Sequence, residues 1–171
     1  MLCISVIESR FRNYTIILRK AQGLGTNDLN IVFYNFNSVL AILGTMKTRP
    51  TTIVLFGITG DLAQKKLLPA IYDLYVSGRL KDTQIVGFSR RDLSKKEIED
   101  VVKATIKTSN FEEKFLDLIT YVSGQFDDLE SYKKLAMHLA DVCDKKLGDC
   151  RNKLFYLSVP PKLYEIIWKN I

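Results

Sequence analysis

Residues 52–63 read TIVLFGITGDLA, and this stretch decides how the chain folds. Its first part, Ile53–Phe56, is a short run of apolar residues, which is typical of a strand buried on both faces of a parallel sheet. A turn with two glycines follows, and apolar residues then recur at helical spacing from Leu62 to Val76. The stretch therefore predicts a strand, a tight turn and a helix, and Pro69 must kink or divide that helix.

The same alternation of strand and helix patterns continues toward the end of the chain. Ser94 and Glu97 have the spacing of a capping box, which marks the start of a second helix. Because strands alternate with helices of roughly ten or more residues, we expect an α/β fold with a doubly wound parallel sheet. Further strands are predicted at residues 84–88, 118–122 and 153–159, and further helices at about 95–107 and 129–145.

Residues 1–50 differ from the rest of the chain. Apolar patches alternate there with Asn-rich and Gly-containing stretches, and no helical or strand period is sustained. The first twenty residues contain four basic side chains against one acidic side chain, which leaves a basic targeting segment as an alternative, although Ser and Ala are scarce. We therefore divide the chain into an N-terminal extension of unknown role, 1–50, and an ordered domain, 51–171.

Composition excludes several classes of protein. The 171 residues are 47% hydrophobic, which is enough for one domain with a buried core. The net charge of +6 suits an anionic ligand, but the basic pairs are too short and isolated for nucleic-acid binding. No run approaches the roughly 18–20 apolar residues that span a bilayer. The three cysteines lack the spacing of a zinc site or a disulfide framework, so we expect no metal and a cytoplasmic location.

The turn after the first strand has the spacing G-x-x-G-x-x-A. Gly57, Gly60 and Ala63 occupy three places where small residues allow a tight reversal, close approach of a pyrophosphate, and packing of helix on strand. The helix N-terminus would offer unpaired N–H groups to the phosphates. A Walker P-loop is excluded because Asp61 follows Gly60. We predict a dinucleotide-binding turn, and the alternative is that the glycines only close a tight turn in another α/β protein.

The end of the next strand indicates which dinucleotide binds. An NAD enzyme usually has an acidic residue there for the ribose hydroxyls, whereas an NADP enzyme has a cation for the 2′-phosphate. This chain has Ser89-Arg90-Arg91, so the charge favours NADP, with Arg90 on the phosphate and Arg91 stacking on adenine or adding charge. The alternative is that both are solvated surface arginines, and the nearby Asp92 would weaken the preference.

Four segments together resemble the glucose-6-phosphate dehydrogenase family. Residues 57–66, GITGDLAQKK, are similar to its GASGDLAKKK signature, and residues 85–90, IVGFSR, to a strand that ends in Ala-Arg-Ser. Residues 121–124, YVSG, and 154–161, LFYLSVPP, are similar to its YVSG and LFYLAVPP. The resemblance covers roughly residues 52–171. Inside the first segment Ile-Thr replaces Ala-Ser and Gln replaces a Lys, and both changes are tolerable.

The resemblance implies oxidation of glucose 6-phosphate at C1 to 6-phosphogluconolactone, with hydride passing to NADP, in the pentose phosphate pathway. It also implies a homo-oligomer, which an incomplete domain argues against. By the same resemblance, Lys66 lies where cofactor and sugar phosphate meet and is the candidate substrate-binding residue. The cofactor-binding residues that we expect are Gly57, Ile58, Thr59, Gly60, Asp61, Leu62, Lys66, Arg90, Arg91, Pro160 and Tyr164.

The resemblance also implies a catalytic His held by an Asp, which this chain does not supply. The family segments Glu-Lys-Pro-Phe-Gly and Arg-Ile-Asp-His-Tyr-Leu-Gly-Lys are absent, and the single histidine, His138, falls inside a predicted helix with Asp141 one turn on. None of the eight tyrosines has Lys four residues later, which excludes the short-chain reductase pair. We therefore expect a Rossmann-like sheet truncated before its last strands, no catalytic residue, no turnover by this chain alone, and a tendency to aggregate. The alternatives are a noncatalytic dinucleotide-binding module and an α/β interaction protein whose turn is only structural.

Overall fold

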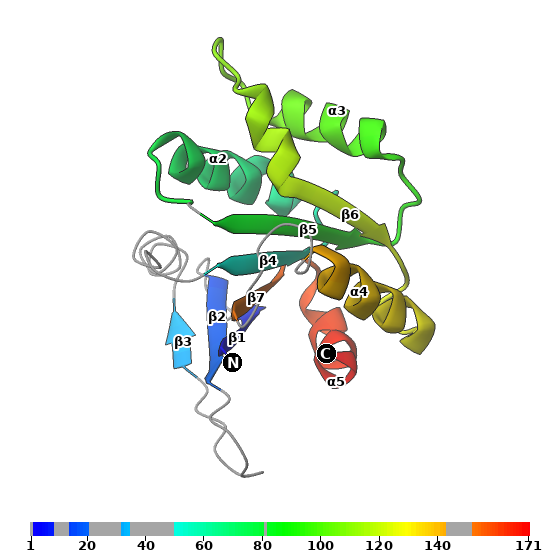
Figure 1. Cartoon of the computed structure of the whole chain (residues 1–171). Helices are drawn as coiled ribbons and strands as arrows, with labels where there is room; N and C mark the ends of the chain where they lie inside the picture. Colours follow the sequence, from blue (N-terminus) through cyan, green and yellow to red (C-terminus); the bar gives the residue numbers. More distant parts are fainter. Residues whose placement is uncertain (1, 9–13, 21–31, 35–49, 81, 143–151) are drawn as a thin grey trace.

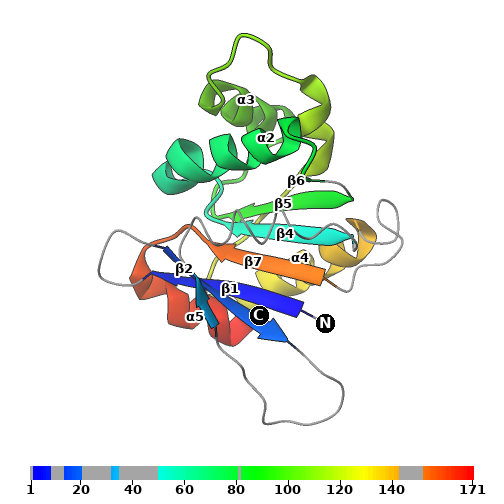
Figure 2. The ribbon, with the colours of Figure 1, turned by 90° about the vertical axis from the view of Figure 1, so that its left-hand side faces the viewer.

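The computed structural model describes residues 2–8, 14–20, 32–34, 50–80, 82–142 and 152–171. Within these residues, seven strands form one sheet in the order β3-β2-β1-β7-β4-β5-β6 (Figures 1 and 2). The strands are β1 (Leu2–Glu8), β2 (Tyr14–Lys20), β3 (Val32–Tyr34), β4 (Thr51–Phe56), β5 (Thr83–Ser89), β6 (Ile119–Ser123) and β7 (Asn152–Leu157).

Helices cover both faces of the four-stranded parallel part, β7-β4-β5-β6 (Figure 1). One face packs against α2, α3 and η2, and the other packs against α4 and α5. This arrangement confirms the predicted doubly wound α/β sheet. The helical segments are η1 (Ala63–Leu67), α2 (Leu68–Val76), α3 (Lys95–Thr105), η2 (Glu113–Leu118), α4 (Leu129–Val142), η4 (Pro161–Leu163) and α5 (Tyr164–Asn170).

The predicted strand, buried on both faces of the sheet, is confirmed as β4. Ile53 and Leu55 point into the core on the α2 and α3 side, whereas Val54 and Phe56 point into the core on the α4 and α5 side. All four side chains are at most 1% exposed. Burying each of them stabilises the fold by roughly 1.5–3 kcal/mol, which explains why a wholly apolar run stands in the middle of the sheet.

The helix after the turn is divided, as Pro69 requires. A π-helical segment, η1, precedes α2, and Pro69 lies in the first turn of α2, where its missing N–H costs little. The capping box is also confirmed, because Ser94 Oγ accepts a bond from the Glu97 N–H and Glu97 accepts one from the Ser94 N–H. The last predicted helix, 129–145, is described up to Val142, and 143–145 lie outside the described residues.

The N-terminal extension continues the sheet, which its sequence did not predict. Backbone pairing places β1 parallel to β7, with Leu2 opposite Asn152 and Ile4 opposite Leu154. β2 then pairs antiparallel with β1, and β3 pairs antiparallel with β2. The expectation of no sustained strand period in residues 1–50 therefore missed three strands, because ladder hydrogen bonds between backbones do not depend on a regular side-chain pattern.

Two expectations from composition concern membranes and metals. In the described part of the chain, no helix is long and apolar enough to cross a membrane. Over those same residues, no group of three or more His, Cys, Asp or Glu side chains could hold a metal ion. Arg10, Arg12, Cys143 and Cys150 lie outside the described residues, so the targeting and cysteine arguments that use them stay predictions.

Candidate cofactor site

The glycine turn lies where the strand order of the sheet reverses. From β4 the chain moves to β5 and β6 on one side, and it later returns to β7 on the other side of β4. In doubly wound sheets this switch point leaves a crevice at the carboxyl ends of the strands, where ligands bind. Gly57 follows β4 here, and its N–H donates to the Phe88 carbonyl at 2.7 Å. Ser158 follows β7, and its N–H donates to the Phe56 carbonyl at 2.8 Å.

Gly57 and Gly60 give the turn its shape. Gly57 has φ +82°, and a Cβ on it would lie 2.7 Å from the Ser158 carbonyl oxygen and 2.8 Å from Val159 Cγ1. Gly60 donates its N–H to the Gly57 carbonyl at 2.8 Å, and a Cβ on Gly60 would lie 3.0 Å from that oxygen. The tight reversal predicted for these glycines is therefore present, and side chains are excluded from its inner surface.

Ile58 lies in the core rather than on the surface of the turn. Its side chain is fully buried in the core against Gly87 of β5. A Cβ on Gly87 would lie 2.7 Å from Ile58 Cδ1, so glycine at that position makes room for the larger side chain. Only the backbone of Ile58 can therefore face a ligand. Ile58 stands where the family pattern has Ala, and Gly87 on the neighbouring strand leaves room for the larger side chain.

The start of the helix after the turn is held by local bonds. The Gln64 N–H donates to the Gly60 carbonyl at 3.0 Å, and Gln64 Nε2 donates to the Thr59 carbonyl at 2.9 Å. Asp61 is exposed and forms an ion pair with Lys65. Lys66 is exposed on η1, and Leu62 is partly buried. The first turn of any helix leaves backbone N–H groups without intrahelical partners, so this end of η1 can bind an anion.

Arg90 and Arg91 are exposed at the end of β5. The Arg90 guanidinium carbon lies 5.9 Å from the centre of the Phe126 ring, in the segment before α4. Asp92 is engaged elsewhere, because its carboxylate accepts a hydrogen bond from the Ser123 hydroxyl at 3.1 Å. That hydrogen bond leaves the charge of the carboxylate in place, so a weaker preference for NADP because of Asp92 stays a prediction.

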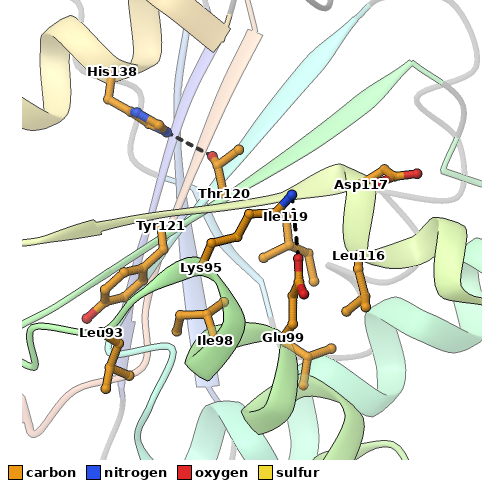
Figure 3. A pocket seen from close by; sticks show the side chains of 11 residues that line it. Leu93, Lys95, Ile98, Glu99, Leu116, Asp117, Ile119, Thr120, Tyr121 and His138 are labelled. Atoms are coloured by element: carbon orange, nitrogen blue, oxygen red, sulfur yellow. Dashed lines mark hydrogen bonds and ion pairs between the residues drawn. The ribbon is translucent and has the colours of Figure 1, made fainter.

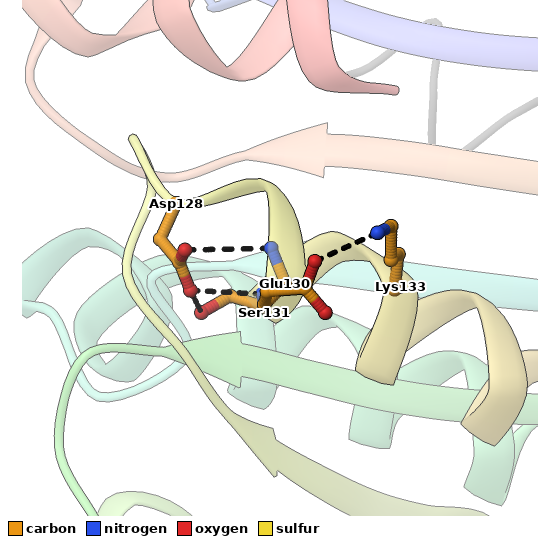
Figure 4. Close-up of polar contacts among 4 residues, drawn as sticks. All are labelled: Asp128, Glu130, Ser131 and Lys133. Atoms are coloured by element: carbon orange, nitrogen blue, oxygen red, sulfur yellow. Dashed lines mark hydrogen bonds and ion pairs between the residues drawn. The ribbon is translucent and has the colours of Figure 1, made fainter.

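The segment that carries Phe126 is fixed by the cap of α4 (Figure 4). The Asp128 carboxylate accepts bonds from the Ser131 N–H at 3.0 Å and from the Ser131 hydroxyl at 2.6 Å. These two bonds hold the pKa of Asp128 below its usual value. The Ser131 hydroxyl in turn accepts from the Gln125 N–H at 3.0 Å. The segment that carries Phe126, beneath Arg90, is thus held in place by its bonds to α4.

Sequence reasoning assigned no role to Ser89 and Tyr121, which lie at this end of the sheet. Ser89 Oγ accepts from Thr59 Oγ1 at 3.2 Å and lies 2.7 Å from the Tyr121 hydroxyl. The Tyr121 hydroxyl also bonds to the Arg91 carbonyl. Burial raises the pKa of Tyr121. These contacts depend on the register that pairs Gly87 with Tyr121, which a single sequence does not reveal.

The two remaining predicted residues, Pro160 and Tyr164, and the single histidine, which was given no site role, lie in different places. Pro160 is exposed just after β7, close in the chain to Ser158. Tyr164 is 7% exposed and packs in the core on the α4 and α5 side, so its ring is not a surface group. His138 lies on α4, and its Nε2 is 2.9 Å from Thr120 Oγ1. It borders a cavity of about 340 Å³ at the β6 edge (Figure 3), two strands from β4.

Comparison with known proteins gives a consistent family. A family model described as "Glucose-6-phosphate dehydrogenase, NAD binding domain" matches residues 54–171. Glucose-6-phosphate 1-dehydrogenase of Cyberlindnera jadinii is 35% identical over 123 residues, which are 70% of this chain and 25% of that protein. Glucose-6-phosphate 1-dehydrogenase 2 of Mus musculus is 40% identical over 123 residues, which are 69% of this chain and 23% of that protein.

Solved structures agree with the sequence matches. A glucose-6-phosphate dehydrogenase in complex with its substrate glucose-6-phosphate has a TM-score of 0.64 at 32% identity, over 71% of this chain and 27% of that one. The enzyme from Mycobacterium avium has a TM-score of 0.61 at 28% identity, over 71% and 26%. The chain thus spans about a quarter of the length of these relatives. Because the family model covers more than half of this chain, the chain belongs to the glucose-6-phosphate dehydrogenase family and contains its NAD-binding domain at residues 54–171.

Proposed function

We propose that this domain binds NADP as the cofactor-binding part of an enzyme that oxidises glucose 6-phosphate at C1. The observation that carries the proposal is the Gly57 turn, which lies at the switch point of the sheet and is tied to both neighbouring strands. A cytoplasmic location and a homo-oligomeric full-length enzyme are the parts of the proposal that rest on cysteine usage and on the family alone.

The residues at the crevice fit a dinucleotide. A Cβ on Gly57 would meet the Ser158 carbonyl, and one on Gly60 would meet the Gly57 carbonyl. The two glycines therefore keep the turn tight beside β7, as a turn that binds a pyrophosphate requires. The N-terminus of η1 adds the positive end of its dipole. Arg90 stands one residue beyond β5, where the 2′-phosphate of an NADP ribose would lie, and Arg91 can add charge or stack on the adenine.

Bound NADP would supply the hydride acceptor, and the residues of this chain would bind and orient it. The turn would hold the pyrophosphate, and Arg90 would hold the 2′-phosphate and select against NAD. Pro160, after the adjacent strand, would lie toward the nicotinamide, and Lys66 would lie where the cofactor meets the sugar phosphate. We expect no turnover by this chain, because its His138 bonds to Thr120 away from the turn.

Calorimetric titration with NADP and NAD tests the proposal. The Arg90→Ala variant should bind NADP more weakly by about 1–3 kcal/mol, which is roughly a 5- to 150-fold change in Kd. Its affinity for NAD should change little. Arg79→Ala is the matched control, because Arg79 is an exposed arginine between α2 and β5, at the opposite end of the sheet.

Three results would count against the proposal. Equal losses in the Arg79 and Arg90 variants would show a general charge effect rather than a 2′-phosphate site. No binding by a folded chain would leave only the fold in common with the family. Oxidation of glucose 6-phosphate by the same preparation would contradict the expected lack of turnover and would show that a residue other than His138 acts as the catalytic base.

A noncatalytic dinucleotide-binding module is the second candidate, and the position of β1 favours it. In the common doubly wound order 3-2-1-4-5-6, β4 corresponds to strand 1 and β7 to strand 4. β1, which pairs with β7, therefore takes the place of strand 5. The extension would then add its strands to the sheet beside β7. A chain that starts at Met46 tests this: aggregation and loss of NADP binding would support the module, whereas retained folding and binding would contradict it.

A further inference from the structure

Three hydroxyl groups connect the glycine turn to the arginine segment. Thr59 Oγ1 donates to Ser89 Oγ at 3.2 Å, and Ser89 Oγ lies 2.7 Å from the Tyr121 hydroxyl. The Tyr121 hydroxyl contacts the Arg91 carbonyl closely, while the Ser89 carbonyl is farther, at 3.4 Å. Thr59 and Ser89 are 8% and 3% exposed, so water does not replace these bonds easily.

The number of protons fixes the direction of each bond. A hydroxyl group has one proton to donate, and it accepts through its lone pairs. The Arg91 carbonyl can only accept, so Tyr121 donates to it. The proton between Ser89 and Tyr121 must then come from Ser89, whose oxygen accepts from Thr59. Thr59 donates to Ser89, and Ser89 and Tyr121 each accept one bond and donate one, so the three hydroxyls point in one direction. Such chains strengthen their members by mutual polarisation.

This chain of bonds links the two halves of the proposed cofactor site. Thr59 belongs to the turn that would hold the pyrophosphate, and Arg91 follows the residue that would hold the 2′-phosphate. In the family pattern that residues 85–90 resemble, alanine stands before the arginine, so the Ser89 hydroxyl is a departure from that pattern. An alanine at this position would break the chain of bonds at its middle.

We propose that Ser89 is a positioning residue that couples the glycine turn to the Arg90-Arg91 segment and thereby sets the preference for NADP over NAD. Ser89 acts through its partners rather than by contact with the cofactor. Its hydroxyl holds Tyr121 against the Arg91 carbonyl, which fixes the backbone beside Arg90 while Phe126 supports the guanidinium. The inference rests on the proposed NADP binding.

Calorimetry on the full chain with NADP and NAD tests the inference. Ser89→Ala and Tyr121→Phe each remove one hydroxyl and keep the rest of the side chain, and each should weaken NADP binding about three- to tenfold. NAD binding should change less than about twofold, because NAD has no group for Arg90 to select. In an Arg90→Ala background, Ser89→Ala should have no further effect.

The control is Tyr72→Phe, whose lost hydroxyl bonds to the Asn110 carbonyl and accepts from the Glu112 N–H away from the turn. This variant should keep the wild-type ratio of NADP to NAD affinity. A readout without cofactor is the hydroxyl proton of Thr59, which should be protected from exchange in the wild type and exposed in Ser89→Ala.

The outcomes separate the inference from the proposed function. Wild-type chain that is folded but binds no NADP overturns both. NADP binding that weakens equally with NAD binding, or that weakens again in the Arg90→Ala background, overturns the role of Ser89 alone. An unaltered ratio in both hydroxyl variants does the same. If Ser89→Ala fails to fold, Tyr121→Phe decides the question, because it removes the next bond in the chain.

Discussion

At the scale of single residues, Gly57 is constrained in two independent ways. Its φ of +82° lies in the left-handed region, where a residue with a Cβ is less stable by roughly 1–2 kcal/mol. A Cβ would also meet the backbone of Ser158 at 2.7 Å, and backbone atoms cannot rotate away as a side chain can. The first constraint is conformational. The second is steric, because an added Cβ would push apart the ends of β4 and β7.

Gly57→Ala should therefore lose more stability than Gly78→Ala. Gly78 has φ +69° but no atom within 4 Å of the added Cβ, so its substitution costs only the conformational part, about 1–2 kcal/mol. Denaturant unfolding should show the extra loss in Gly57→Ala. Calorimetry should show that NADP binding is abolished in this variant and kept in Gly78→Ala. Equal stability of the two variants would contradict the close approach of Gly57 to Ser158.

Local patterns predicted the elements that depend on neighbouring residues. Ile53–Phe56 lie in β4, Pro69 divides the helix that follows, and Ser94 caps α3, because each feature follows from sequence spacing. The burial of Ile58 did not follow, since it needs Gly87 on the adjacent strand. The bond from Tyr121 to the Arg91 carbonyl joins residues 30 apart in the chain, and only the register of β6 brings them together.

At the scale of elements, the N-terminus of α4 links stability to pH. The Ser131 hydroxyl and N–H hold the pKa of Asp128 below its ordinary 3.8, so the folded state favours the carboxylate. The unfolded state binds the proton more readily, and the stabilisation is therefore complete above pH 3.8 and is lost as pH falls through the lower folded pKa. The bonds in Figure 4 are the cause.

Asp128→Asn should lower the melting temperature at pH 7 by about 1–4 °C, because asparagine can still cap the helix but lacks the negative charge that its N-terminus favours. The difference from the wild type should shrink below pH 3.8, where the wild-type carboxylate also becomes neutral. Asp127→Asn removes the same charge from the neighbouring position and serves as the control. Thermal unfolding monitored by circular dichroism from pH 3 to pH 7 measures both. A difference that does not depend on pH would mean that the cap is not the source of the stabilisation.

At the scale of the molecule, two apolar cores lie on opposite faces of the sheet, and only one of them supports the arginine segment. Phe56 lies in the core on the α4 and α5 side, with the rings of Phe88 and Phe126 centred 5.2 Å and 6.3 Å away. Phe126 is the ring beneath Arg90. Phe115 lies in the other core, packed on Tyr72 with centroids 5.1 Å apart.

Phe56→Ala and Phe115→Ala should be similarly destabilising but differ in cofactor binding. Both side chains are fully buried, so each substitution should cost about 3–5 kcal/mol, a large share of the 5–15 kcal/mol typical of a domain. Measured at a temperature where both variants remain folded, NADP affinity should fall in Phe56→Ala, because Phe126 loses its support. It should be unchanged in Phe115→Ala. Equal affinities would show that the placement of Arg90 does not depend on the core beneath it, and would leave the backbone bond at Arg91 as its main support.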